Sequence, residues 1–303
     1  MNNVMLADAG SIPNESIFMK KKRMSDTVLS GFIYLSAAVS VLLLLGIIGY
    51  VFTNGIQSVN WEFLSTVTSA RKGTTGILGN IVNTLYVIVI TLLIATPVGI
   101  GSAIYLNEYA KPGKLVCVIE FTTETLSGIP SIIFGLFGMI VFGEVLGFKY
   151  SILTGSFTLT LMILPLITRN TQEALKTVPD SYRSGALGIG ATKWYMIRTI
   201  LLPSAMPGIV TGIILAIGRI VGESAALLFT AGSGYLLPKN GFAGYVDKLS
   251  QPGGTMTIQL YLSMQKGEFD VAFGIAIVLL VIVFIINILT KVITKKLDVN
   301  NRK

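Results

Sequence analysis

Six apolar segments, each long enough to cross a lipid bilayer as a helix, constrain this chain more than any other feature. They lie at about residues 28–53, 78–106, 118–142, 150–169, 204–230 and 271–293. A hydrocarbon core about 30 Å thick needs roughly 20 apolar residues in helical form. Only 13% of the residues are charged, which is too little to cover an ordinary soluble domain with a polar surface. We therefore predict an all-α membrane protein with six transmembrane helices.

The basic residues predict the side of the membrane on which each connection lies. If both termini are cytoplasmic, 16 of the 23 Lys and Arg residues lie inside, 6 lie outside and Arg219 lies within a span. The positive-inside rule favours that orientation. We accordingly expect a disordered cytoplasmic segment, a first transmembrane helix with an outer loop, a core and a cytoplasmic tail. These cover residues 1–24, 25–75, 76–294 and 295–303.

Several kinds of chemistry are excluded by residues that the chain lacks. It has no histidine and a single cysteine, Cys117, so it offers neither a Cys/His metal site nor an internal disulfide. A P-loop needs Gly-Lys-Ser or Gly-Lys-Thr, and the nearest match, Gly113-Lys114-Leu115, has the wrong third residue. The net charge of +8 is spread between apolar segments, which argues against nucleic acid as a partner. We expect that the chain is not an enzyme and that any energy from ATP comes through a partner.

The connection from residue 170 to residue 203 is long and, in the predicted topology, cytoplasmic. Its Val178-Pro179-Asp180 sequence indicates a turn and a helix start, which Asp180 is expected to cap. The small residues between Ala186 and Ala191 then leave room for another surface to approach closely. An alternative is a connector that lies on the bilayer, to which Trp194 and its basic neighbours are suited. The residues alone leave both interpretations open.

A spaced signature in this connection resembles the EAA loop of ABC importer permeases. Gly190 is followed, after nine residues, by Ile200-Leu201-Leu202-Pro203. The resemblance implies a coupling helix that fits a groove in an ATPase subunit. It assigns ATPase coupling to Ser184, Gly185, Ala186, Leu187, Gly190 and Pro203. Because Ser184 stands where the signature has glutamate, we expect docking to depend on shape and small residues more than on an acidic contact.

Further strings, spread over most of residues 75–235, resemble the PstA family of phosphate importer permeases. They are Asn83-Thr84-Leu85, Pro97-Val98-Gly99-Ile100, Tyr105-Leu106-Asn107-Glu108-Tyr109-Ala110, Ser127-Gly128-Ile129-Pro130-Ser131 and Gly218-Arg219-Ile220-Val221-Gly222-Glu223-Ser224. The resemblance implies the type I ABC importer permease (MetI-like) fold, in which one chain forms half of a translocation path. It also implies a multi-pass protein of the bacterial cell membrane.

The same resemblance implies a set of partners within and beside the membrane lipid. They are a second permease (PstC-like), an ATPase dimer (PstB-like) that uses the ATP, and an extracytoplasmic phosphate-binding protein (PstS-like). This chain itself is expected to bind no cofactor. One alternative is a permease for another oxyanion, such as sulfate or molybdate, because the coupling signature is shared across substrates. Another is a transporter that needs no ATPase, although the sequence has no clear inverted repeat to favour it.

Arg219 and Glu223 lie in the fifth predicted span, where ionisable side chains are costly and usually face protein or water. Their i, i+4 spacing puts them on one face of a continuous helix. A guanidinium suits phosphate oxygens, and the carboxylate would neutralise it when the path is empty. We therefore predict that both residues line a substrate path. The alternative is a structural ion pair that holds helices together.

Arg169 ends the fourth predicted span, beside Asn170. The simpler interpretation is that its side chain reaches the cytoplasmic headgroups. The alternative is a phosphate contact at the inner mouth of the path. The Gly-rich outer connection 231–270 is too short for a separate domain. It either meets a binding protein or simply joins two spans.

Overall fold

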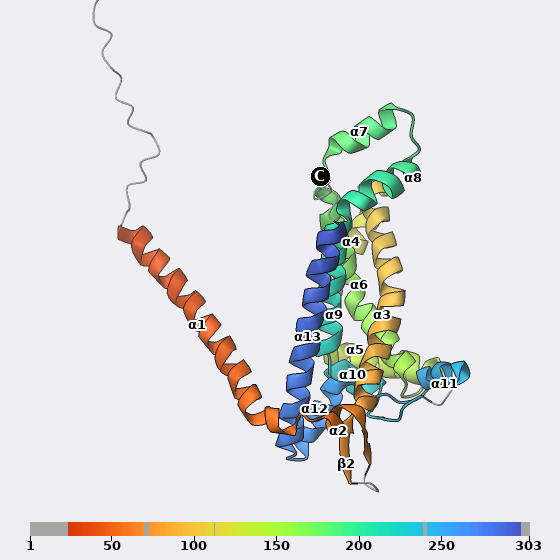
Figure 1. Ribbon diagram of the computed structural model, residues 1–303. Coiled ribbons are helices and arrows are strands. Elements are labelled where there is room, and N and C mark those ends of the chain that lie inside the picture. The colour runs from red at the N-terminus through yellow and green to blue at the C-terminus, as the bar shows by residue number, and fades with distance from the viewer. Residues whose placement is uncertain (1–23, 70–72, 112, 239–240, 298–303) are drawn as a thin grey trace, which may run out of the picture. The chain divides into compact units, whose positions relative to one another are not determined.

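The computed structural model describes residues 24–69, 73–111, 113–238 and 241–297 (Figure 1). Two predicted segments fall largely outside the described residues. They are the disordered segment at residues 1–24, of which only Met24 is described, and residues 298–303 of the tail. The chain divides into two compact units, Met1–Tyr50 and Val51–Lys303. The described part of the first unit belongs to helix α1 (Met24–Gly55). This helix is long and apolar enough to cross a membrane, and none of its most apolar stretch is buried inside the protein.

The second unit is a helical bundle with a small antiparallel β-hairpin at one end (Figure 1). Its long helices are α3 (Leu78–Ile104), α6 (Ile152–Lys176), α9 (Leu202–Gly222) and α13 (Phe269–Leu297). Around them lie α2 (Trp61–Ser65), β1 (Val67–Ser69), β2 (Thr74–Ile77), α4 (Lys114–Gly128), α5 (Ser131–Gly138), α10 (Ala225–Thr230), α11 (Phe242–Asp247) and α12 (Met256–Gln265). Helices α7 (Asp180–Gly188) and α8 (Lys193–Met196) lie at the end opposite the hairpin, where α13 also ends (Figure 1).

Short segments of other helix types extend or join these elements. The π-helical turns are η2 (Tyr105–Tyr109), which continues α3, η3 (Met139–Val145), which continues α5, and η4 (Ile197–Leu201), which joins α8 to α9. The 3₁₀ turns are η1 (Ile56–Ser58) and η5 (Lys248–Ser250). Single π-turns within α-helices are often found at functional sites.

Within the described residues, five helices are long and apolar enough to cross a membrane, and a bent pair brings the number to six. The bent pair consists of α4 and the segment Ser131–Val145, which meet at 104°. The third predicted span, residues 118–142, corresponds to this bent pair. Pro130 disfavours a helical conformation at the residue before it. Ile129 is accordingly extended (φ −72°, ψ 131°), and the helix breaks there.

The fifth predicted span, residues 204–230, is wrong at both ends. The observed helical segment begins at Lys193 and stops at Gly222, and α10 is a separate helix. Glu223 is extended, with φ −79° and ψ 125°. Its carboxylate Oε1 accepts a hydrogen bond from the Ala226 amide of α10 at 3.0 Å. A carboxylate at a helix start satisfies a free N–H group, which stabilises the break.

The two long connections of the predicted topology are partly helical. Residues 170–203 were predicted as one connection, but α6 continues to Lys176, and the helical segment that leads into α9 begins at Lys193. The outer connection 231–270 holds α11, η5 and α12. Asn83 of α3 fixes this connection, because its Nδ2 donates to the Gly234 carbonyl at 2.8 Å. An amide buried in a helical bundle needs such a partner.

Lys248 lies in this outer connection and is only 1% exposed. Its Nζ donates to the Pro252 carbonyl at 3.2 Å. Burial lowers the pKa of this ammonium group, because removal from water disfavours the charged form. A basic residue that the charge count places at the outer surface is therefore part of the packed structure.

Helices α3, α6 and α9 form the core of the bundle. Val87, Leu159 and Ala216, one from each helix, are buried in the same apolar cluster. Helix α3 approaches α6 closely at Gly99, where an added Cβ would lie 2.7 Å from Ile167 Cγ2. Small residues permit such close packing of membrane helices. This core holds α6 and α9 side by side.

Candidate functional site

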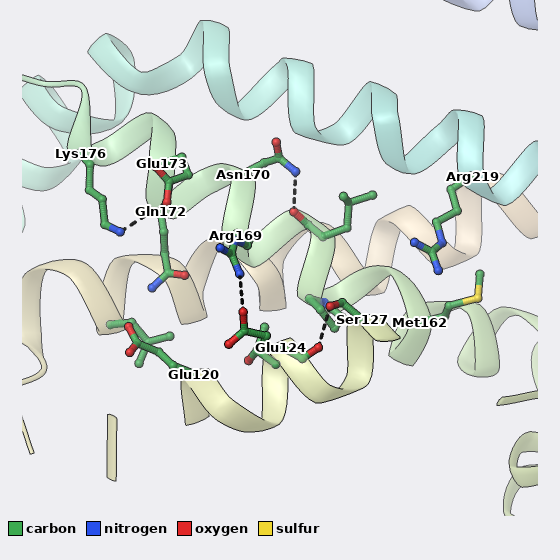
Figure 2. A pocket seen from close by; sticks show the side chains of 14 residues that line it. Glu120, Glu124, Ser127, Met162, Arg169, Asn170, Gln172, Glu173, Lys176 and Arg219 are labelled. Atoms are coloured by element: carbon green, nitrogen blue, oxygen red, sulfur yellow. Dashed lines mark hydrogen bonds and ion pairs between the residues drawn. The ribbon is translucent and has the colours of Figure 1, made fainter. Parts of the chain in front are cut away.

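A cavity of about 520 Å³ lies among α4, α6 and α9, with η2 at its edge (Figure 2). Its lining carries equal numbers of basic and acidic side chains. The basic residues are Arg169, Lys176 and Arg219, and the acidic residues are Glu120, Glu124 and Glu173. A lining with this much charge suits a charged solute and water rather than lipid tails.

Arg169 is held loosely at this cavity. Its Nη1 lies 3.7 Å from Oε1 of Glu124 on α4, and the two side chains are 65% and 72% exposed. Figure 2 shows the guanidinium extending from α6 toward α4. Exposed ion pairs of this kind contribute about 0–1 kcal/mol, so Arg169 can exchange Glu124 for another anion at little cost.

Lys176 and Glu173 form a second pair at the end of the cavity nearer to α7. The Nζ to Oε1 distance is 3.4 Å, and both side chains are more than half exposed. The pair is formed between neighbouring turns of α6, three residues apart. It is therefore as exchangeable as the pair made by Arg169.

Arg219 lines the same cavity from the last turn of α9. Figure 2 shows its side chain directed toward the cavity, on the side of Met162. No hydrogen bond or ion pair joins its guanidinium to another of the described residues. Five N–H donors in a planar fork are thus free to bind an anion.

Glu223 does not pair with Arg219 as predicted. The helix ends between the two residues, so they do not share a helix face. Glu223 instead accepts from Ala226 N, and its backbone carbonyl accepts from Oγ1 of Thr257 at 2.8 Å. The carboxylates that line the cavity belong to α4 and α6. Glu223 is not among the residues that line this cavity.

Glu120 and Glu124 are functional candidates that the sequence analysis missed. They lie one turn apart on α4 and both face the cavity. Two acidic residues at i, i+4 spacing inside a predicted apolar span are the signal that would have identified them. The group cannot be read as a metal site, because no three His, Cys, Asp or Glu of the described residues are placed to hold an ion.

The segment predicted to couple to an ATPase forms helix α7 and the turn after it. Ser184, Gly185, Leu187 and Gly190 are all exposed. The Ser184 hydroxyl donates to the Asp180 carbonyl at 3.2 Å, within its own helix. It therefore makes no contact that holds α7 to the bundle.

The structure places two residues of this segment differently from what the sequence suggests. Ala186 is 4% exposed and packs inward with Leu175 and Leu201. Asp180 does not cap the helix, because Pro179 is the N-cap and no side chain bonds to the first turn. The Asp180 carboxylate accepts instead from Arg183 Nη1 at 3.0 Å.

Gly190 and Pro203 each have a clear local role. Gly190 ends the turn after α7 with φ 85°, a left-handed conformation that glycine adopts without steric cost. Pro203 lies at the start of α9, directly after the π-helical turn η4. Apolar side chains beside them point outward, and Ile189 is 86% exposed. The end of the bundle therefore presents an apolar, glycine-lined surface.

The chain resembles known proteins in family, sequence and structure. Residues 95–299 match the family described as "Binding-protein-dependent transport system inner membrane component". The chain is 38% identical to the probable ABC transporter permease protein YqgI of Bacillus subtilis, over 70% of this chain and 72% of that protein. It is 30% identical to the phosphate transport system permease protein PstA of Haemophilus influenzae, over 75% of this chain and 80% of that protein.

A solved structure shows the same architecture. It is the bacterial alginate ABC transporter in complex with an alginate pentasaccharide-bound periplasmic protein. The TM-score is 0.64 at 16% identity, and the match covers 91% of this chain and 96% of that chain. At this identity the likeness shows the fold alone, and it confirms the predicted ABC importer permease fold.

Proposed function

The chain belongs to the family of binding-protein-dependent transport system inner membrane components, and from this premise we propose that it is the permease subunit of an ATP-driven importer of inorganic phosphate. The family gives the class of protein: a membrane subunit that works with an ATPase and a substrate-binding protein. The substrate follows from the relatives named as phosphate permeases and from the charged cavity.

The observation that carries the proposal is Arg219 in the cavity wall, with no partner among the described residues. A guanidinium binds phosphate oxygens through two parallel, charge-assisted hydrogen bonds. Arg169 supplies a second guanidinium to the same cavity. In this structure Glu124 pairs with Arg169, which is the neutralising role that the sequence analysis gave to Glu223 beside Arg219. A phosphate ion that enters the cavity would replace Glu124 at Arg169 or bind the unpaired guanidinium of Arg219.

The acidic lining favours phosphate over sulfate or molybdate as the solute. Near neutral pH inorganic phosphate still carries a proton, whereas sulfate carries none. An ionised carboxylate is an acceptor only, so Glu120 and Glu124 can accept a hydrogen bond from a protonated phosphate. A fully deprotonated oxyanion has no hydrogen to donate to these carboxylates, so their negative charges would repel it without a compensating hydrogen bond.

Coupling to ATP would occur at the surface made by α7 and the turn at Gly190. Exposed Leu187 and Ile189, together with exposed glycines, suit a close apolar contact with a groove of an ATPase subunit. We place this end of the bundle in the cytoplasm. The basic residues Lys111, Lys114, Lys176, Lys193, Arg198 and Lys291 belong to connections or helix ends on this side. Both termini are proposed to lie on that side as well.

The partners follow from this assignment. One chain supplies half of the path, and a second permease (PstC-like) would supply the other half. A PstB-like ATPase dimer would bind and hydrolyse the ATP, and a PstS-like protein would deliver phosphate from the opposite side. No cofactor is assigned to this chain itself.

The test is uptake of labelled phosphate into proteoliposomes that contain the complete complex. We expect uptake that requires ATP and the ATPase subunits, and that a tenfold excess of sulfate or molybdate does not suppress. Suppression by sulfate or molybdate would assign the path to that oxyanion. Uptake by the chain without ATPase subunits would instead show a transporter that needs no ATP.

A further inference from the structure

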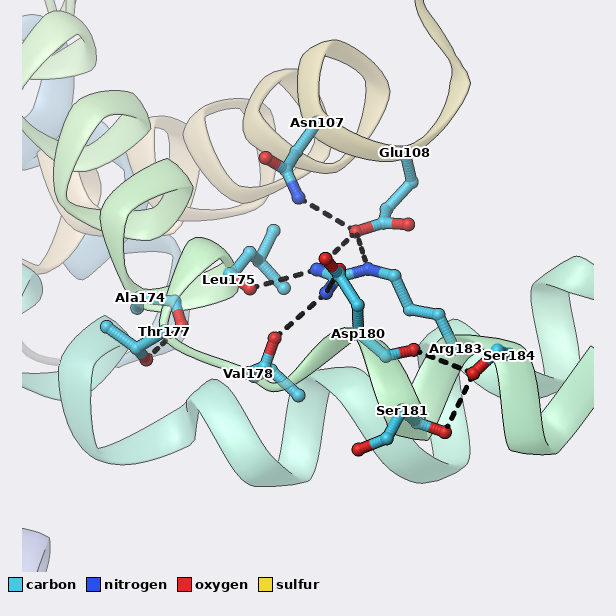
Figure 3. A network of polar contacts seen from close by, with 10 residues as sticks. All are labelled: Asn107, Glu108, Ala174, Leu175, Thr177, Val178, Asp180, Ser181, Arg183 and Ser184. Atoms are coloured by element: carbon cyan, nitrogen blue, oxygen red, sulfur yellow. Dashed lines mark hydrogen bonds and ion pairs between the residues drawn. The ribbon is translucent and has the colours of Figure 1, made fainter.

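Arg183 of α7 makes an unusually complete set of hydrogen bonds (Figure 3). Its Nε and Nη2 donate to Oε1 of Glu108 at 3.2 and 3.0 Å. A second hydrogen of Nη2 goes to the Leu175 carbonyl at 3.0 Å, and Nη1 donates to the Val178 carbonyl at 2.9 Å and to Asp180 at 3.0 Å. A guanidinium has five N–H donors, and all five are used.

The pair between Arg183 and Glu108 is also largely shielded from solvent. The Glu108 side chain is 5% exposed and the Arg183 side chain 19%. Nδ2 of Asn107 donates to the same Glu108 oxygen at 2.8 Å. Asp180, by contrast, is 96% exposed and adds little. The firm contacts of the guanidinium are therefore with Glu108 and the carbonyls at the end of α6.

These contacts reach two walls of the charged cavity. Glu108 lies in η2, the π-helical end of α3, and Leu106 of the same turn lines the cavity. Leu175 lies in the last turn of α6, and its neighbour Lys176 lines the cavity too. A shift of α7 would therefore act directly on both walls, because the Arg183 side chain of α7 is bonded to η2 and to the end of α6.

Little else holds α7 in place. Ala186 is the only buried residue of this helix within the described part of the chain. A contact from the next helix reinforces the same turn, since Nζ of Lys193 lies 4.9 Å from the centre of the Tyr109 ring. Both helices of the exposed segment are thus fastened to η2.

We infer that Arg183 and Glu108 form the joint that carries movement of the ATPase-docking helix α7 to the cavity walls α3 and α6, so that both are positioning residues for transport. This inference rests on the proposed function, because it needs an ATPase partner on α7. The joint acts by keeping α7, η2 and the end of α6 as one body. Without it, α7 would follow the ATPase while the cavity walls did not.

The test compares labelled phosphate uptake with ATP hydrolysis in proteoliposomes of the complete complex. The variant is Glu108→Gln, and the matched control is Asp180→Asn, which removes the exposed carboxylate on the same guanidinium. We expect Glu108→Gln to lower phosphate taken up per ATP hydrolysed by roughly tenfold, with hydrolysis maintained. Asp180→Asn should keep the wild-type ratio.

An equal ratio of uptake to hydrolysis in Glu108→Gln and in wild type would overturn the inference, even if both rates fell together. If Glu108→Gln prevents assembly of the complex, the same two rates are measured for Arg183→Lys. Lysine keeps the charge but lacks the planar fork that reaches both Glu108 and the α6 carbonyls, so the same loss of ratio is expected. Failure of the proposed function would look different, because the wild-type complex itself would show no ATP-dependent phosphate uptake.

Discussion

The two charged clusters of this protein differ in how tightly they are built. At the cavity, Arg169 and Glu124 are 3.7 Å apart, and both side chains are well over half exposed. At the joint, Arg183 and Glu108 are 3.0 Å apart, and their side chains are 19% and 5% exposed. The cavity also holds Arg219 with no partner among the described residues, whereas every donor of Arg183 is used.

This difference indicates two uses of the same chemistry. An exposed, long ion pair is weak, so an incoming anion can replace one of its members. A buried and fully bonded pair resists separation, because breaking it leaves an unpaired charge away from water. The cavity is thus suited to a solute that comes and goes, and the joint to transmission of movement.

The largest effect should be on stability at the joint. We predict that Glu108→Gln lowers the unfolding free energy of the chain by about 3 kcal/mol, since it leaves the largely shielded guanidinium of Arg183 without its carboxylate. Asp180→Asn should cost at most about 0.5 kcal/mol. Thermal unfolding of the purified chain in detergent measures both. Equal losses in the two variants would erase the distinction between buried and exposed partners of Arg183.

The next largest effect concerns transport rather than stability. Arg219→Lys should lower phosphate uptake by roughly tenfold, because a point charge replaces the bidentate fork. The unfolding temperature should stay that of wild type, since Arg219 is bonded to none of the described residues. Uptake rates and thermal unfolding measure the two parts. A destabilised but active variant would assign Arg219 a structural role instead.

A smaller change is expected when the loose pair is opened. Glu124→Gln should alter the phosphate concentration for half-maximal uptake by about two- to fivefold, because Arg169 loses a weak competing anion. Competition by sulfate should increase in the same variant, since an acceptor-only carboxylate has been removed. Uptake assays with graded sulfate test this. Unchanged sulfate competition would show that the carboxylate does not select the anion.

The smallest effect is expected at Ser184. Its hydroxyl bonds only to carbonyls within α7, so Ser184→Ala should change uptake and ATP hydrolysis by less than about twofold. Parallel assays of the two rates provide the check. A large loss of coupling would mean that the hydroxyl, rather than the shape of α7, meets the ATPase.

Much of the fold was predictable because lipid imposes a simple pattern on a chain. The long apolar segments indicated the spans. Short sequence strings along the core indicated the family. Local breaks were harder. Pro130 and the Glu223 cap interrupt segments whose apolar composition continues across them, so composition alone extends the helix.

The candidate site was only partly predictable. Arg219 stood out because charges inside spans are costly, whereas Arg169 was left between a headgroup contact and a phosphate contact; the structure brings both to one cavity. The joint could not be deduced from spacing, since Arg183 and Glu108 are 75 positions apart in the sequence. Glu223 was assigned to the path because the helix was expected to continue, which it does not.

The most direct measurement is uptake of labelled phosphate by proteoliposomes of the complete complex, with and without ATP, for wild type and for Arg219→Gln. The account predicts ATP-dependent uptake by wild type and, in the variant, loss of that uptake with the complex still assembled. ATP-dependent phosphate uptake at the wild-type rate by Arg219→Gln would contradict it, because phosphate would then cross without the arginine that the cavity offers.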